Sequence, residues 1–192
     1  MSHDKKKAWR LKKGVLGQDT KRSDWVTSAY FVVDEVRDKI CRDLNVRPTL
    51  DAFASSLNHR FPRYWSKVDG DDAFHHNWRD EDLLWINAPF ELYPKVLDRL
   101  KEDRARAVVV CPAWTHLKWF REMQRYMVRQ VVVPRGIRIF QREGEGGMPL
   151  RQRKWETVAM LVDMGQETPP EPLPTRPPRC PTKKPDDGYR TG

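Results

Sequence analysis

The apolar run at residues 107–111 (Ala-Val-Val-Val-Cys) constrains the fold of this chain more than any other segment. A strand with one solvent-exposed face alternates apolar and polar residues, whereas a central strand of a parallel sheet is apolar on both faces. The run therefore predicts a central parallel strand that is covered on both sides. A second short apolar run at residues 83–86 predicts a buried strand next to it.

Helical and extended patterns alternate along the chain and indicate an α/β protein. The predicted helices, marked by apolar residues at helical spacing, lie at residues 23–44, 92–104 and 117–127. The predicted strands lie at residues 49–53, 83–86, 107–111 and 130–133. Residues 54–82 show no sustained period and are predicted to form a long loop, which in a compact domain is often functional.

The sequence pattern of the predicted domain changes after Pro134, where helical spacing gives way to extended segments. Residues 137–140 and 155–162 flank a charged, glycine-rich segment and are predicted to pair as antiparallel strands that close the sheet. We therefore expect a mainly parallel sheet with helices on both faces and an antiparallel strand pair at its C-terminal end.

Charge is unevenly distributed between the predicted domain and its flanks. The chain of 192 residues has 36 Lys and Arg against 27 Asp and Glu, a net charge of +9. Residues 1–22 hold eight basic and two acidic residues and are predicted to be a disordered basic arm. Such an arm favours polyanions such as DNA through counterion release, and a solubilising tail is the alternative. Residues 23–165 form the predicted domain, and residues 166–192 a proline-rich disordered tail.

Cysteine and histidine usage narrows the class of protein. Cys41, Cys111 and Cys180 are far apart and form no C-x-x-C pattern, which is typical of a reducing, intracellular compartment. No apolar run is long enough to span a membrane, and no signal peptide is recognisable, so no membrane partner is expected. His59 and the pair His75-His76 fit no common zinc spacing, so no metal is expected.

Three clusters of residues that could bind a ligand or take part in catalysis follow the ends of predicted strands. They are Asp51-Ala-Phe-Ala54, Asn87-Ala-Pro-Phe90 and Cys111-Pro-Ala-Trp-Thr-His-Leu-Lys-Trp-Phe120. Ligands of open α/β sheets bind at the carboxyl ends of the strands. We therefore expect the three clusters to meet in one pocket.

In order and spacing, these clusters resemble the phage-type (Dam-like) family of DNA N6-adenine methyltransferases. They resemble more closely the Dam-like segment in polyproteins of DIRS-type tyrosine-recombinase retrotransposons. The match covers about residues 24–140. The motifs that carry it are Asp24-Trp25, Leu50-Asp-Ala-Phe-Ala-Ser-Ser-Leu-Asn58, Phe61-Pro-Arg-Tyr-Trp-Ser66, Asp72-Ala-Phe74, Asn87-Ala-Pro-Phe90 and Val108-Val-Val-Cys-Pro-Ala-Trp114.

The resemblance implies a methyltransferase-like (Rossmann-like) sheet that binds S-adenosylmethionine and an adenine flipped out of DNA. Asn87 and a backbone carbonyl of the turn would accept the two N–H bonds of the adenine amino group, and Phe90 would stack on the base. The implied catalytic set is Asn87, Ala88, Pro89 and Phe90. The implied cofactor-binding set is Asp51, Phe53, Ala54 and Pro112.

The sequence departs from the family pattern at two points. Ala88 replaces a proline that stiffens the turn, and no Phe-x-Gly-x-Gly loop is present. A catalytically degenerate, retroelement-derived nucleic-acid-binding domain is therefore the alternative function. A hydrolase or nuclease is disfavoured, because acidic residues do not cluster at the strand ends as two-metal chemistry requires.

Nucleic-acid contacts are predicted in two places. The first is an aromatic and basic stretch whose rings would stack on bases while its cations contact phosphate, and the second is a basic helix face. The predicted residues are Arg60, Arg63, Tyr64, Trp65, Lys67, Lys118 and Arg121. The structural alternatives stay open: Asn87 as a turn cap, Asp51 as a turn residue, and a helix face that is merely solvated.

Overall fold

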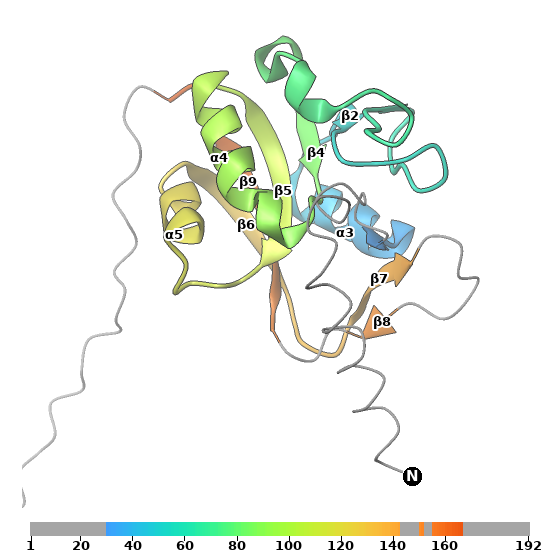
Figure 1. Cartoon of the computed structure of the whole chain (residues 1–192). Coiled ribbons are helices and arrows are strands. Elements are labelled where there is room, and N and C mark those ends of the chain that lie inside the picture. The colour runs from blue at the N-terminus through green and yellow to red at the C-terminus, as the bar shows by residue number, and fades with distance from the viewer. Residues whose placement is uncertain (1–29, 143–149, 152–154, 167–192) are drawn as a thin grey trace, which may run out of the picture.

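A six-stranded sheet with helices on both faces forms the centre of the computed structural model (Figure 1). The structure describes residues 30–142, 150–151 and 155–166. The predicted α/β class is confirmed. The predicted basic arm (1–22) and all but the first residue of the predicted tail (166–192) lie outside the described residues.

The strand order of the large sheet is β3-β2-β4-β5-β9-β6. Its strands are β2 (Leu50–Asp51), β3 (Arg63–Tyr64), β4 (Leu84–Ile86), β5 (Arg106–Pro112), β6 (Met127–Val133) and β9 (Thr157–Asp163). The first four strands in this order are parallel to one another. Strand β9 runs antiparallel to both β5 and β6, so β6 has the same direction as β5. The sheet is thus mixed and mostly parallel.

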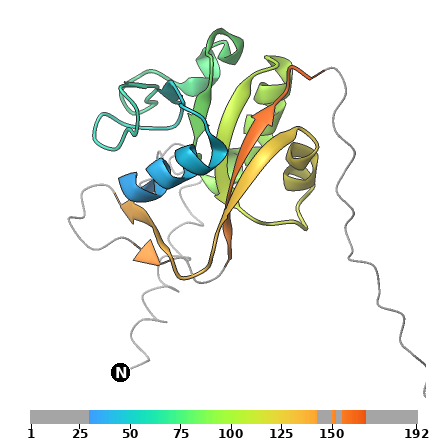
Figure 2. The same cartoon turned by 180° about the vertical axis from the view of Figure 1, so that it is seen from behind.

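Helices α4 (Tyr93–Glu102) and α5 (Lys118–Gln124) cover one face of the sheet, and α3 (Asp34–Leu44) covers the other (Figures 1 and 2). The apolar run in β5 explains why both faces need a cover. Val109 packs in the core beneath α4 and α5, while its neighbours Val108 and Val110 pack in the core beneath α3. The prediction that this strand is buried on both faces is confirmed.

A second, smaller sheet lies beside the carboxyl ends of the parallel strands. It has the order β1-β7-β8, with β1 (Tyr30–Val32), β7 (Arg138–Arg142) and β8 (Leu150–Arg151). Strands β7 and β9 are antiparallel strands as expected, but the prediction that they pair with each other is wrong. Residues 157–162 of β9 are all buried and suit the sheet interior, whereas in β7 only Ile139 is fully buried.

The first helix begins later than its periodicity predicts. Residues 30–32 form strand β1, and α3 begins at Asp34. The run Tyr-Phe-Val-Val favours extended structure, and the carboxylates of Asp34 and Glu35 suit the positive end of a helix. The helix ends at Asn45, which adopts the left-handed conformation with φ 53°. Met127 was also predicted to be helical but begins β6.

The predicted loop over residues 54–82 is anchored by Trp78. It contains β3 and two short 3-10 helices, η1 (Ala73–His75) and η2 (Trp78–Asp80). The Trp78 ring is fully buried, and its Nε1 donates to the Ala73 carbonyl at 2.7 Å. The Trp78 backbone N–H donates to the Asp103 carboxylate, also at 2.7 Å, which ties the loop to the end of α4.

Candidate functional site

The carboxyl ends of three neighbouring parallel strands form the candidate site. Strands β2, β4 and β5 are adjacent and parallel, and they end at Asp51, Ile86 and Pro112. The three sequence clusters therefore follow strands at the same edge of the sheet, as predicted. The small sheet lies next to this edge (Figure 1).

The side chain of Tyr93 anchors the turn at residues 87–90 through a hydrogen bond to the turn's backbone. This side chain is fully buried, and its hydroxyl donates to the Val110 carbonyl of β5 and accepts from the backbone N–H of Ala88. Burial raises the pKa of Tyr93 well above its ordinary value, and the Ala88 hydrogen bond opposes this only in part. A proline at position 88 would have no N–H to offer, so Ala88 makes a hydrogen bond that proline, the residue expected from the resemblance, could not make.

Replacing Tyr93 with phenylalanine tests this anchor. The change leaves the Val110 carbonyl and the Ala88 N–H buried without their partner, so we expect the free energy of unfolding to fall by about 1–3 kcal/mol. Urea unfolding of Tyr126→Phe is the control, because the Tyr126 hydroxyl has no hydrogen bond to another described residue. An equal loss in both variants would contradict the role of Tyr93.

Asn87 is half-buried, and one of its polar atoms is already engaged. Its Nδ2 donates to the backbone carbonyl of Tyr30 in β1 at 3.1 Å. The amide oxygen makes no hydrogen bond to another described residue. Asn87 can therefore present its amide oxygen as an acceptor, and the second N–H of Nδ2 as a donor, to a ligand at the edge.

An aromatic cluster stands beside the turn. The rings of Phe90, Trp114 and Trp155 contact one another edge to face, with centroids 5.2 to 5.7 Å apart. Phe90 is 40 % exposed, so the cluster presents a ring to the outside. Trp155 Nε1 is buried without a hydrogen-bond partner in the described part of the chain. An exposed aromatic ring of this kind can stack on a planar base.

Sequence reasoning did not place Trp155 or Tyr93 in the site. Trp155 comes just before β9, and because β9 is antiparallel, its amino end reaches the edge where the parallel strands end. The available signal for Tyr93 was its position three residues after Phe90, at the start of a helix. Neither residue could be placed without the strand order.

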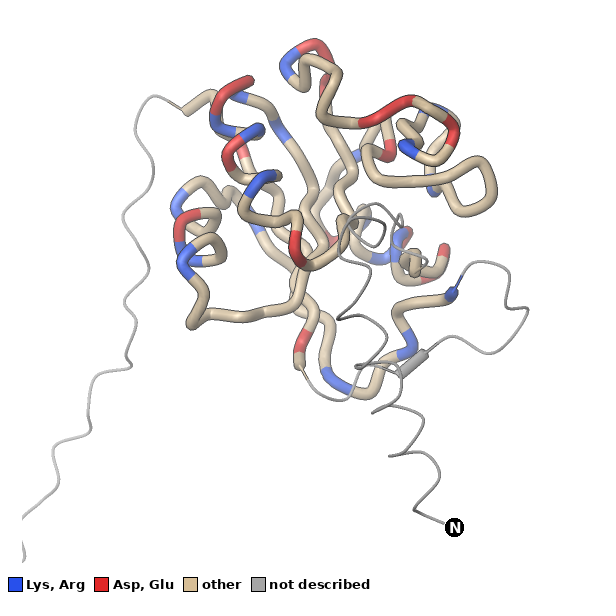
Figure 3. The backbone as a smooth tube through the Cα atoms, in the orientation of Figure 1, with Lys and Arg blue, Asp and Glu red and all other residues tan. Residues whose placement is uncertain are grey.

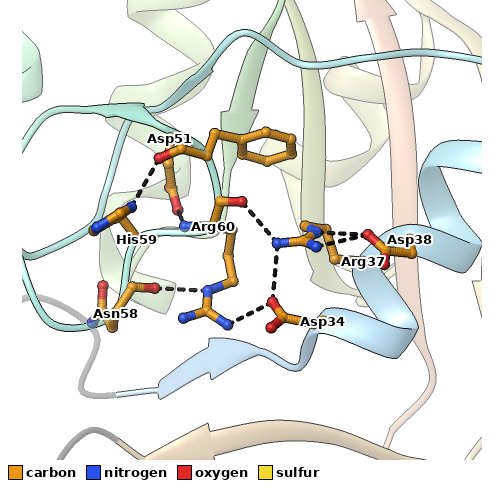
Figure 4. Close-up of polar contacts among 8 residues, drawn as sticks. Asp34, Arg37, Asp38, Asp51, Asn58, His59 and Arg60 are labelled. Atoms are coloured by element: carbon orange, nitrogen blue, oxygen red, sulfur yellow. Dashed lines mark hydrogen bonds and ion pairs between the residues drawn. The ribbon is translucent and has the colours of Figure 1, made fainter.

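Asp51 lies beneath its own loop. It is 4 % exposed and accepts hydrogen bonds from the backbone N–H of Arg60, at 2.9 Å (Figure 4), and from the backbone N–H of Phe53. Burial raises the pKa of Asp51 to about 6, and the two backbone hydrogen bonds oppose that rise. The carboxylate thus organises residues 52–60, and its contact with a cofactor remains a prediction.

The other predicted cofactor residues lie near Asp51 but have different surroundings. Phe53 is half-buried and packs edge to face on Phe74 and Trp78, at 5.5 and 6.1 Å between ring centroids. Ala54 and Pro112 are buried. Phe53 therefore belongs to the packing around Trp78.

The predicted nucleic-acid cations at residues 60–67 are neutralised within the protein. Arg60 pairs with Asp34 at 2.8 Å, in the polar network drawn in Figure 4. Arg63 binds Glu81 through two hydrogen bonds of 2.7 Å. Lys67 lies 3.1 Å from the Asp72 carboxylate. These cations are therefore weaker candidates for phosphate contacts than the sequence alone indicates.

The aromatic members of this stretch are also engaged. Tyr64 stacks on His59 at 4.4 Å between ring centroids, and Trp65, which is 6 % exposed, stacks on His76 at 4.3 Å. By contrast, Lys118 and Arg121 are exposed on α5 and have no ion pair with another described residue. The structure thus brings the two predicted groups into different environments.

A charged cavity lies away from the carboxyl edge. It has a volume of about 570 Å³ and lies between the loop at residues 67–75 and α4. Lysine and arginine side chains line it together with Asp72, Asp98 and Glu102, so its charges balance within the protein. It offers no preference for a ligand of one sign.

The described residues, 30–142, 150–151 and 155–166, contain neither a cluster of metal ligands nor a helix that could span a membrane. No group of three or more His, Cys, Asp or Glu side chains in these ranges could hold a metal ion. Over the same ranges, no helix combines the length and the apolar character that crossing a bilayer requires.

Comparison with known proteins gives no family assignment. A scan against protein-family models returns no match, and a search of curated proteins finds no significantly similar sequence.

Proposed function

We propose that this chain is a DNA-binding domain on a methyltransferase-like sheet, and that it holds an unstacked adenine at the turn of residues 87–90. The observation that carries this proposal is the position of that turn at the carboxyl end of β4, between the ends of β2 and β5. An open acceptor on Asn87 and an exposed ring on Phe90 stand there together.

The chemistry of adenine suits these groups. Its exocyclic amino group is a hydrogen-bond donor that the Asn87 amide oxygen can accept. Its flat ring can stack on Phe90, which contacts Trp114 edge to face at 5.2 Å between ring centroids. Both contacts need a base that has left the duplex stack, or a single strand.

S-adenosylmethionine fits the end of β2 less well than adenine fits the turn of residues 87–90. Asp51, the residue implied to contact it, exposes 4 % of its surface and already accepts two backbone hydrogen bonds. The loop after β2 has no glycine before Gly70 that would let a ligand approach its backbone closely. We therefore derive no methyl-transfer step from this arrangement.

DNA adenine N6-methylation is the second candidate function, and the same turn favours it. An acceptor and a stacked ring that hold the amino group would also aim its lone pair, which is most of what amino-group methylation requires. The two candidates differ in whether the domain also binds the methyl donor.

Binding of adenine-containing single-stranded DNA tests the proposal. We expect Phe90→Ala to weaken binding by about tenfold, because stacking of a base on an aromatic ring contributes about 1–3 kcal/mol. Tyr126→Ala is the matched control, since Tyr126 is a half-buried aromatic residue that contacts Lys101 of α4 and is not part of the Phe90 cluster. Unchanged affinity of Phe90→Ala would rule out the stacking contact.

Calorimetric titration with S-adenosylmethionine separates the two candidates. Micromolar, one-to-one binding that Asp51→Ala abolishes would establish the methyltransferase candidate. No heat at high protein concentration, with the fold shown intact by circular dichroism, would leave DNA binding as the function.

A further inference from the structure

Helix α5 presents two cations that have no acidic partner among the described residues. Lys118 and Arg121 are exposed, and neither makes an ion pair or a hydrogen bond with another described side chain. They are three residues apart, so their side chains lie on the same side of the helix. Phe120 and Met123 are buried on its other side. The helix therefore presents a basic face to solvent.

The one acidic residue in the sequence of α5 already binds other cations. Glu122 pairs with Lys101 of α4 at 3.0 Å and with Arg125 at 3.3 Å. Residues 113–117, which connect β5 to α5, contain no acidic residue. In Figure 3 this connection carries no charged position, whereas basic positions follow it along α5 at the left of the molecule. Neither α5 nor the connection before it therefore offsets the two free charges.

Helix α5 packs against the residue that anchors the turn of residues 87–90. Trp119, which follows Lys118, stacks on Tyr93 with 4.9 Å between the ring centroids and 14° between the ring planes. The Tyr93 hydroxyl accepts the backbone N–H of Ala88 in that turn. Two aromatic side chains thus fix the basic face of α5 relative to the turn.

The aromatic cluster beside the turn is also joined to α5 through the chain. Trp114 contacts the exposed ring of Phe90 with 5.2 Å between centroids. The Trp114 carbonyl accepts the backbone N–H of Leu117 at 2.9 Å, which closes a turn that leads directly into Lys118. The ring that can stack on a base and the basic face therefore lie at the two ends of one short, hydrogen-bonded connection.

We propose that Lys118 and Arg121 bind phosphates of the DNA strand whose unstacked base lies on Phe90. This inference rests on the proposed function and adds where the backbone of that strand runs. Proteins that bind a single strand combine aromatic rings that stack on bases with cations that follow the backbone. Both features stand together here, whereas the cations of residues 60–67 are matched by carboxylates.

The salt dependence of binding measures such phosphate contacts. Binding of the full chain to a fluorescent, adenine-containing single strand is followed by anisotropy between about 50 and 200 mM salt. Each phosphate contact with a single strand contributes about −0.7 to the slope of log K against log salt. We expect Lys118→Ala/Arg121→Ala to reduce the magnitude of the slope by about 1.4 and to weaken binding at low salt.

Arg42→Ala/Arg47→Ala is the matched control for charge. Both arginines are exposed, make no ion pair with another described residue and lie together at the end of α3. Because α3 covers the opposite face of the sheet (Figure 2), we expect the same loss of charge there to leave the slope almost unchanged. The exchange Lys118→Arg/Arg121→Lys keeps both charges and should keep the slope. Circular dichroism of each variant checks that the fold is intact.

Phe90→Ala separates the base contact from the phosphate contacts. This substitution removes a stacking ring but no charge, so it should weaken binding at every salt concentration and keep the slope.

The possible outcomes separate this inference from the proposed function. Binding by the wild type with an unchanged slope in Lys118→Ala/Arg121→Ala would overturn the phosphate contacts and leave the base contact in place. An equal loss of slope in both double alanine variants would also overturn them, since only net charge would then matter. A lower slope with no effect of Phe90→Ala would overturn the base contact instead. No binding by the wild type would overturn both, and tighter binding of the matching RNA strand would overturn the choice of DNA.

Discussion

Replacing Trp78 with alanine is expected to lower the free energy of unfolding by about 3–5 kcal/mol, as for other fully buried tryptophans. The change removes the ring that packs on Phe53 and Phe74 and the indole N–H that donates to the Ala73 carbonyl. Because a small domain has little stability to spare, this variant should be largely unfolded near body temperature.

Leu57→Ala is the control for this experiment. Leu57 lies in the same loop but is 76 % exposed, so its loss should change the unfolding free energy by no more than about 0.5 kcal/mol. Urea unfolding at a single temperature compares the two. If both variants lost less than 1 kcal/mol or so, Trp78 would not be the anchor of residues 54–82.

Asp51→Asn is expected to stabilise the protein at neutral pH by as much as about 3 kcal/mol. Burial raises the pKa of Asp51 to about 6 from its ordinary 3.8, so the folded state holds its proton more tightly than the unfolded chain does. That difference corresponds to the stated energy at about 1.4 kcal/mol per pH unit. The wild-type contribution is favourable below pH 3.8, falls as the pH rises toward 6, and is lost above it.

Unfolding measured from pH 4 to 7 checks the sign of this effect. The advantage of Asp51→Asn over the wild type should grow across the window and level off above pH 6. Glu122→Gln is the control with the opposite sign, because its hydrogen bond with Lys101 lowers the pKa of Glu122. The Glu122 contribution is present above its ordinary pKa of 4.5 and is lost on acidification. A constant difference between Asp51→Asn and the wild type would contradict the buried-charge account.

A carboxylate that destabilises the fold at neutral pH, at the edge where ligands of such sheets bind, is typical of a functional site. The same substitution therefore has two readouts. Greater stability with unchanged DNA binding would show that Asp51 only organises its loop. Greater stability with weaker ligand binding would place it in the site.

The local sequence was sufficient to predict those helices, strands and turns whose hydrophobic or turn pattern is strong. The apolar run of β5, the apolar stripe of α4 and the turn after β4 were all predicted, because each depends on neighbours within a few residues. Parallel strands that end in polar clusters necessarily place these clusters at one edge, so the candidate site could also be located.

Partner choice between distant segments was decided by the tertiary structure. Both β7 and β9 read as strands, but only the buried interior of the large sheet, between β5 and β6, could decide that β9 belongs there. Residues 30–32 carry both a helical and an extended signal, and pairing with β7 selected the strand.

The charged residues show most clearly which features the sequence determines and which only the tertiary structure determines. The sequence determined that residues 60–67 are basic and aromatic, and it determined the arginines of residues 123–142 equally well. Only the folded chain brings Glu81 to Arg63 and Asp72 to Lys67, while Arg135 and Arg138 keep no acidic partner among the described residues. Periodicity depends on neighbours in the chain, but electrostatic neutralisation depends on distance in space, which the tertiary structure alone sets.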